Sequence, residues 1–269
     1  GLSTNGRPIF EYTIIPPKKR YWVPIVAAMV KPPKIVIFSG VHGAERMGHL
    51  GTISFISNLM NEWKNLDGYD KLRFGVEFVI VPVANPDGIN NNTRGNANGV
   101  DLNRNFDADW SQEGSPDPAD PFYYGSSVAS ETETKILAQI PTQHSDAILF
   151  IDHHQGNEAY FYWMGSETEQ GRNLCLDVMN EMFIYHQKHV NPQDGNAVID
   201  NMGRLSQNGA GTLARWIQKQ GKQCVLYESA PSGHPAIGDS WLKARKLSAH
   251  GIFTICSKAY QKYLNSQTV

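Results

Sequence analysis

Short apolar segments that stop at polar residues alternate along this chain with longer segments whose apolar residues recur every three or four positions. The clearest short segments are 34–40, 146–152 and 223–229, which read KIVIFSG, DAILFID and QCVLYES. Runs of this length and β-branched content predict buried strands of a mostly parallel sheet. Two further strands are expected, one within 72–88 before a Pro and Gly turn, and an aromatic one at 159–165.

Helices are expected between these strands, at 44–63, 130–140, 168–188, 212–221 and 240–264. Ser130 and Glu133 have the spacing of a capping box at the start of the second helix. Alternating strands and helices predict an α/β fold, a mixed but mostly parallel central sheet with helices on both faces. Because no linker-like segment divides residues 1–269, we expect a single domain. In such folds, ligands bind at the carboxyl ends of the strands.

The bulk composition limits the function classes. A formal net charge of −2 argues against a nucleic-acid partner or an anionic membrane surface. The sequence has no run of 18 apolar residues, so no transmembrane helix is predicted. The first residues lack the basic segment followed by an apolar segment that is typical of a signal peptide. The expected location is therefore the cytoplasm, ahead of export with the leader removed. The three cysteines are too scattered for a disulfide framework and are expected to be small buried apolar residues.

The segment FSGVHGAERMG, residues 38–48, places His42 and Glu45 three residues apart just after the first apolar run. At the entry to a helix, positions i and i+3 share a face, so an imidazole and a carboxylate can point at one ion about 2 Å from each. The alternative is a polar pair at a helix N-terminus, where the helix dipole favours glutamate.

A third ligand is expected from FIDHHQG, residues 150–156, where an apolar segment supplies Asp152, His153 and His154. Adjacent strand residues point to opposite faces, so at most one of these histidines should face the metal. The other is expected to be a hydrogen-bonded turn histidine. Two histidines and a carboxylate with one open position are typical of a catalytic zinc site.

Residues 89–128 lack a sustained period, and loops this long are usually functional or disordered. They contain TRGNANGVDLNRNF, residues 93–106. The order HGAE, NPDG, GVDLNRNF, a histidine at a strand end and then a glutamate at a strand end resembles the zinc carboxypeptidase family, the carboxypeptidase A-like metallopeptidases. The resemblance spans about residues 34 to 231 and is closer to bacterial members without a pro-segment.

The resemblance implies one Zn²⁺ ion held by His42, Glu45 and His154, with His153 in reserve. It also implies that Asp101 orients His42, a role that nothing else would single out among the loop aspartates. Such a metal is expected to hold the water that attacks the amide bond.

The resemblance assigns four further residues to the chemistry. Glu228, in VLYESA, matches the catalytic glutamate that takes a proton from the zinc-bound water and passes it to the leaving nitrogen. Arg94 matches the arginine that polarises the scissile carbonyl. Asn103 and Arg104 match the pair that binds the free carboxylate of a peptide or small amide substrate. The alternatives are a surface glutamate on an edge strand for Glu228 and a solvated loop arginine for Arg104.

Three functions follow as expectations. The first is a zinc-dependent metallocarboxypeptidase that removes a C-terminal residue. The second keeps the zinc site but acts as a murein-peptide amidase or an N-acyl amino acid deacylase. It is favoured because no tyrosine occurs from 186 to 226, where the digestive enzymes carry one, and because the chain is short and its loop resembles that of bacterial members. The third is a non-catalytic binding module, which is disfavoured because the ligands and Glu228 are all retained. A residue that sets side-chain preference is expected within 205–216, where the only charged residue is Arg215, which is expected to lie on the helix.

Overall fold

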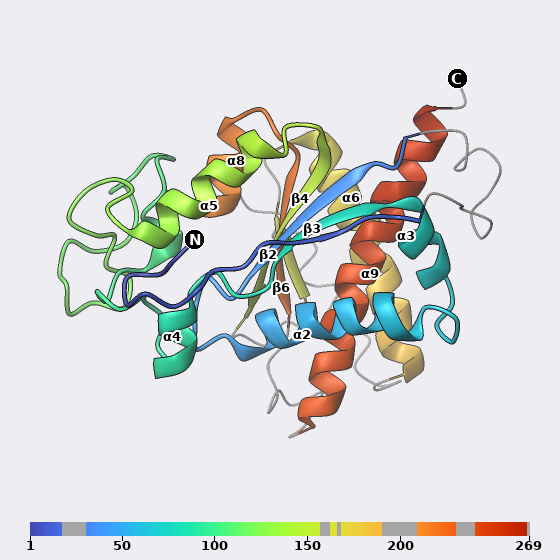
Figure 1. Ribbon diagram of the computed structural model, residues 1–269, viewed down its shortest axis with the longest axis horizontal. Coiled ribbons are helices and arrows are strands. Elements are labelled where there is room, and N and C mark those ends of the chain that lie inside the picture. The colour runs from blue at the N-terminus through green and yellow to red at the C-terminus, as the bar shows by residue number, and fades with distance from the viewer. Residues whose placement is uncertain (18–30, 157–161, 166–167, 190–208, 230–239, 268–269) are drawn as a thin grey trace.

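A mixed β-sheet runs through the centre of the molecule in a computed structural model (Figure 1). The structure describes residues 1–17, 31–156, 162–165, 168–189, 209–229 and 240–267. In this part of the chain the strand order is β1-β3-β2-β4-β6-β5. The strands are β1 (Tyr12–Ile14), β2 (Lys34–Ser39), β3 (Glu77–Val81), β4 (Ala147–Gln155), β5 (Tyr162–Gly165) and β6 (Cys224–Ser229). The four inner strands are parallel, whereas β1 and β5 pair antiparallel at the two edges.

Helices cover both faces of the sheet, which confirms the predicted α/β architecture (Figure 1). One face is covered by α2 (Arg46–Ser57), α3 (Tyr69–Gly75), α6 (Glu169–His189) and α9 (Trp241–Ser266). The other is covered by α5 (Thr132–Gln143) and α8 (Leu213–Lys219). Each interface has its own apolar core, because the inner strands present buried side chains such as Ile37 and Phe38 to opposite faces. None of the described helices is long and apolar enough to cross a bilayer.

Three local expectations differ from the structure. The segment expected to be a strand from residue 72 begins as α3, whose Leu72 and Phe74 pack into the core, and the strand starts only at Glu77. The NPDG turn contains a short helix, α4 (Pro86–Asn91), capped by the Asn85 side chain. The capping box is wrong, because α5 has Glu131 at its N-cap without a side-chain hydrogen bond.

Glu133, expected in that capping box, instead ties the N-terminal segment to α5. Its carboxylate accepts hydrogen bonds from the backbone N–H and the hydroxyl of Thr4. The three cysteines are buried thiols without disulfides, as the sequence indicates. Of the aromatic segment at 159–165, residues 159–161 lie outside the described residues.

The parallel strands β2, β4 and β6 end at the same edge of the sheet, and the turn after β2 is shaped by a glycine. A Cβ atom on Gly43 would lie 1.9 Å from the carbonyl carbon of Gly88 in α4. Any larger side chain would therefore push the turn away from α4. The close approach fixes the path of the chain between His42 in the turn and Glu45, the N-cap residue of α2.

Candidate metal centre

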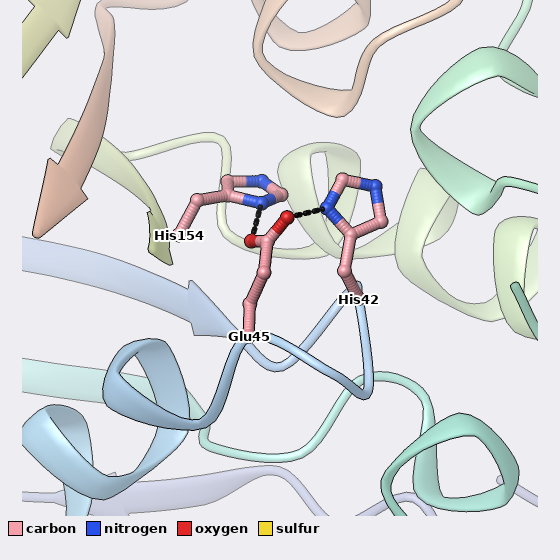
Figure 2. Close-up of side chains that lie close together, drawn as sticks. All are labelled: His42, Glu45 and His154. Atoms are coloured by element: carbon pink, nitrogen blue, oxygen red, sulfur yellow. Dashed lines mark hydrogen bonds and ion pairs between the residues drawn. The ribbon is translucent and has the colours of Figure 1, made fainter. Parts of the chain in front are cut away.

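Three side chains from two distant parts of the chain meet at this edge of the sheet (Figure 2). The Glu45 carboxylate lies between two imidazoles, with Oε1 2.6 Å from Nδ1 of His42 and Oε2 3.0 Å from Nδ1 of His154. The three candidate ligand atoms lie within 4.8 Å of one another, and all three residues are buried. The structure therefore brings together the side chains that were expected from the sequence to be metal ligands.

A further carboxylate lies behind each imidazole. Asp101 Oδ1 is 2.9 Å from Nε2 of His42, and Asp152 Oδ1 is 3.0 Å from Nε2 of His154. A neutral imidazole has one N–H, so a ring that donates to its aspartate from Nε2 turns an Nδ1 lone pair toward Glu45. A lone pair facing a carboxylate needs a proton or a cation between them. Two Nδ1 atoms and a carboxylate are a donor set that zinc prefers, so these residues fit the ion.

The electrostatics of this cluster also favour a cation. Burial lowers the pKa of His154, but the carboxylates of Asp152 and Glu45 outweigh burial, and the pKa lies well above its usual value. The pKa of His42 is raised for the same reason, by Glu45 and Asp101 acting against burial. Burial raises the pKa of Glu45, but the two histidines hold it well below the usual range. The carboxylates thus make the space between the rings favourable for positive charge.

The two candidate arginines differ in their partners. Arg94 donates from Nε to Asp101 Oδ2 at 2.8 Å and from Nη1 to Glu45 Oε1 at 3.3 Å. Arg104 donates from Nη1 to the carbonyl of Asn103 at 2.8 Å, and its buried Nε has no hydrogen-bond acceptor. No acidic side chain of the described residues forms an ion pair with Arg104. Its guanidinium therefore keeps donors for an external anion.

The NH2 group of the Asn103 amide is also available to bind a further acceptor. Its Oδ1 accepts a hydrogen bond from the backbone N–H of Leu213 at 2.8 Å, which fixes the side chain against the start of α8. Its Nδ2 lies 3.4 Å from Nε2 of His154. An Nε2–H that donates to Asp152 cannot accept from Asn103, so the amide N–H groups remain for another acceptor.

Glu228 is the register partner of His154 on the neighbouring parallel strand, and its side chain is partly buried. Burial raises the pKa of its carboxyl to about 7, and the negative charges of Glu45 and Asp152 act in the same direction against the two histidines. A carboxyl group that has such a pKa and lies beside a candidate metal site is suited to act as a general acid or base.

His153 points to the opposite face of β4, as strand alternation requires. Its Nδ1 lies 2.9 Å from the Thr52 hydroxyl, its Nε2 lies 3.1 Å from that of Ser248, and its ring stacks on Tyr227 at 4.8 Å. Burial lowers its pKa to about 3. His153 is thus a neutral histidine of the core, and its place in the fold separates it from the cluster around Glu45.

The sequence analysis missed the position of Asp152 behind His154. The available signal was its i−2 spacing on the same strand, which puts both side chains on one face. Arg215, in the segment expected to form the specificity pocket, lies on α8 and is bonded to Asp109 at 2.7 Å. Residues 205–208 of that segment lie outside the described residues.

Comparisons with known proteins agree with this geometry. The zinc carboxypeptidase family model matches residues 1–245. Carboxypeptidase A4 of Mus musculus is 27% identical over 150 residues, which cover 50% of this chain and 36% of that protein. This chain therefore spans about a third of that curated relative's length.

Two solved structures show the same fold. Thrombin activatable fibrinolysis inhibitor has a TM-score of 0.74 and 18% identity, with 98% of this chain and 68% of that chain covered. The murein-tripeptide amidase MpaA from Escherichia coli O157 has a TM-score of 0.51 and 18% identity, with 93% and 90% covered. The family match over most of the sequence, together with this fold, shows that the chain belongs to the zinc carboxypeptidase family.

Proposed function

We propose that residues 1–269 form one catalytic domain of a zinc-dependent metallohydrolase that removes a C-terminal residue from a peptide or peptide-like amide. The observation that carries this proposal is the convergence of His42, Glu45 and His154 within 4.8 Å at the carboxyl ends of the parallel strands. His42 Nδ1, the Glu45 carboxylate and His154 Nδ1 would hold one zinc ion. When bound, zinc acts as a Lewis acid and lowers the pKa of a coordinated water to about 7.

The partners of the two histidines prepare them for that ion. Asp101 accepts the Nε2 proton of His42, and Asp152 accepts that of His154. Each aspartate fixes the tautomer that leaves Nδ1 free and makes the ring a stronger donor. Asp101 also anchors Arg94, so one carboxylate orients a ligand and an arginine together.

Glu228 is proposed as the general base and acid. Its pKa of about 7 lets the carboxylate accept a proton near neutral pH and return it to the leaving nitrogen. Its position beside His154, on the next parallel strand, places it at the same edge of the sheet as the ligands. The order of the sheet argues against a surface role on an edge strand, because β6 lies between β4 and β5.

Arg94, Asn103 and Arg104 are proposed to bind the substrate. Arg94 borders the Glu45 carboxylate, which supports its role in stabilising the developing oxyanion. Arg104 has a buried Nε without an acceptor, and Asn103 has amide donors to spare. Together they suit a planar carboxylate at the end of the substrate.

The experiment measures zinc content and hydrolysis of benzoyl-glycyl dipeptides that end in Ala, Phe, Lys or Glu. We expect one zinc per chain and release of a terminal amino acid from at least one of them. The Glu228→Gln variant should keep its zinc but lose about a hundred- to ten-thousand-fold in kcat. Glu62→Gln, a surface substitution of the same kind, is the control. Undiminished activity of Glu228→Gln would refute the proposed base, and a protein that binds no zinc and releases no terminal residue would refute the function.

A second candidate keeps the zinc site and acts on murein peptides or N-acyl amino acids. It is favoured by the lack of tyrosine from 186 to 226 and by Asn91, where the digestive enzymes carry a second arginine. The fold is also similar to that of a murein-tripeptide amidase, which makes a murein tripeptide a substrate worth testing. Faster hydrolysis of a murein tripeptide than of the benzoyl-glycyl dipeptides would support this candidate, and inertness toward the murein tripeptide would remove its amidase form.

A further inference from the structure

An aromatic side chain outside the proposed machinery touches both arginines. The guanidinium carbon of Arg94 lies 4.8 Å from the centroid of the Phe122 ring, and that of Arg104 lies 5.8 Å from it. Both distances are within the range of about 6 Å for attraction between a cation and an aromatic ring. Phe122 belongs to the long irregular segment between the GVDLNRNF motif and α5, and its side chain is 45% exposed.

The backbone holds this ring at the edge of the site. The Phe122 carbonyl accepts a hydrogen bond from the N–H of Ser115 at 3.0 Å, and its N–H donates to Asp120 Oδ1 at 2.8 Å. The next residue, Tyr123, accepts from the N–H of Asp101 at 2.8 Å. Gly114 has a φ of +96°, and a Cβ atom there would lie 2.6 Å from the Phe122 carbonyl oxygen. The loop is therefore bonded to the residue that orients His42.

The chemistry of the ring suits a support for Arg104, the arginine proposed to bind the free carboxylate. A carboxylate that held a guanidinium would use its N–H donors and would compete with an anionic substrate. An aromatic face attracts the cation without accepting its N–H groups in the plane. Arg104, which forms no ion pair with an acidic side chain of the described residues, depends most on such a support, because an unrestrained arginine side chain loses much rotamer entropy on binding.

We propose that Phe122 is a positioning residue that holds Arg94 and Arg104 ready for the carboxyl-terminal end of the substrate. This inference rests on the proposed function, in which these arginines contact the scissile carbonyl and the free carboxylate. It predicts that loss of the aromatic face weakens the preference for a free carboxylate, while zinc binding remains, because Phe122 contacts the arginines and not the candidate ligands.

The test measures binding to the zinc-loaded Glu228→Gln variant, so that no turnover occurs. The probes are benzoyl-Gly-Phe, benzoyl-Gly-Lys and benzoyl-Gly-Glu, each compared with its C-terminal amide. In Phe122→Leu we expect the preference for acid over amide to fall by about five- to thirty-fold. Phe122→Trp should restore it. Phe10→Leu is the matched control, since Phe10 is 56% exposed and its ring centroid lies 5.9 Å from that of Tyr12.

A double variant separates positioning from a general loss of structure. With Arg104→Met already present, Phe122→Leu should have little further effect on acid binding if its effect acts through Arg104. The same preference for acids in Phe122→Leu as in the parent, or an equal loss in Phe10→Leu, would overturn the inference and leave the proposed function standing. If the parent itself prefers no acid over its amide, both the carboxylate-binding role and the inference fail.

Discussion

His154 and Glu228 are register partners on the neighbouring parallel strands β4 and β6. Because paired residues of adjacent strands point to the same face, the sheet places an imidazole and a carboxylate side by side without help from any loop. Asp152, two residues before His154, shares that face and lies behind the ring. One strand therefore supplies both a candidate ligand and the group that orients it.

Asp152→Asn tests whether that aspartate orients His154. The amide cannot accept the Nε2 proton as strongly as a carboxylate, so we expect zinc affinity to fall by about 10- to 100-fold. Competition with a chromophoric chelator measures the affinity without reference to activity. Asp146→Asn makes the same change at a surface aspartate paired with Lys34 and should leave the affinity unchanged. Equal zinc affinities for Asp152→Asn and the parent would contradict this role.

The two adjacent histidines should respond differently to the same substitution. His154→Gln removes a candidate ligand, so zinc affinity should fall by more than about 100-fold, beyond the loss of an orienting partner. His153→Gln should keep the zinc but lose about 1–3 kcal/mol of unfolding free energy, because buried hydroxyls lose their partner. Chelator competition and urea denaturation measure the two effects. Loss of zinc in His153→Gln with retention in His154→Gln would reverse the assignment.

Gly43→Ala tests the close approach between the turn after β2 and α4. The new methyl group would meet the Gly88 carbonyl carbon, so we expect a loss of about 1–3 kcal/mol in stability and weaker zinc binding, because His42 moves with the turn. Gly221→Ala is the control. It lies in open space with a φ of +71° and should cost about 1–2 kcal/mol while zinc affinity is kept. Unchanged zinc affinity in Gly43→Ala would show that the turn tolerates displacement.

His49 on α2 makes stability depend on pH in the acidic range. Burial lowers its pKa to about 4, and the charge of Arg46 adds to that effect. Its neutral form is favoured in the folded state, so its contribution is complete above the unfolded pKa of about 6.5 and is lost as the pH falls toward 4. The loss amounts to about 3 kcal/mol.

The variant His49→Leu should lack this part of the pH dependence. Urea denaturation of the chelator-treated proteins at pH 7 and pH 4.5 gives the difference in unfolding free energy for each. We expect a smaller decrease for His49→Leu than for the parent. Parallel decreases would show that His49 does not titrate in the folded protein as its burial implies.

The sheet and the major helices could be predicted from periodicity, because strands β2, β4 and β6 are apolar on both faces and α2, α6 and α9 keep a helical spacing. Short elements could not. The segment 72–76 has strand-like composition, but Leu72 and Phe74 bury as helical residues against the core. Ser130 and Glu133 have capping-box spacing, but the Glu133 carboxylate accepts its hydrogen bond from Thr4, which is 129 residues away in the sequence.

The candidate site divides in the same way. His42, Glu45 and His154 follow from local spacing, strand alternation and the family resemblance. The contacts of the Asp152 and Phe122 side chains depend on the folded structure. The i−2 spacing puts Asp152 on the same face as His154 but does not show that it contacts the ring, and the loop residue Phe122 carries no local signal. The packed structure puts Asp152 behind the imidazole and Phe122 against two arginines.

The most direct measurement is the anomalous diffraction of crystals soaked in zinc, recorded on both sides of the zinc absorption edge. We predict one strong peak per chain between Nδ1 of His42, the Glu45 carboxylate and Nδ1 of His154, at about 2.0–2.2 Å from each. A zinc-loaded crystal with no peak there, or with its ion bound by other side chains, would contradict the account.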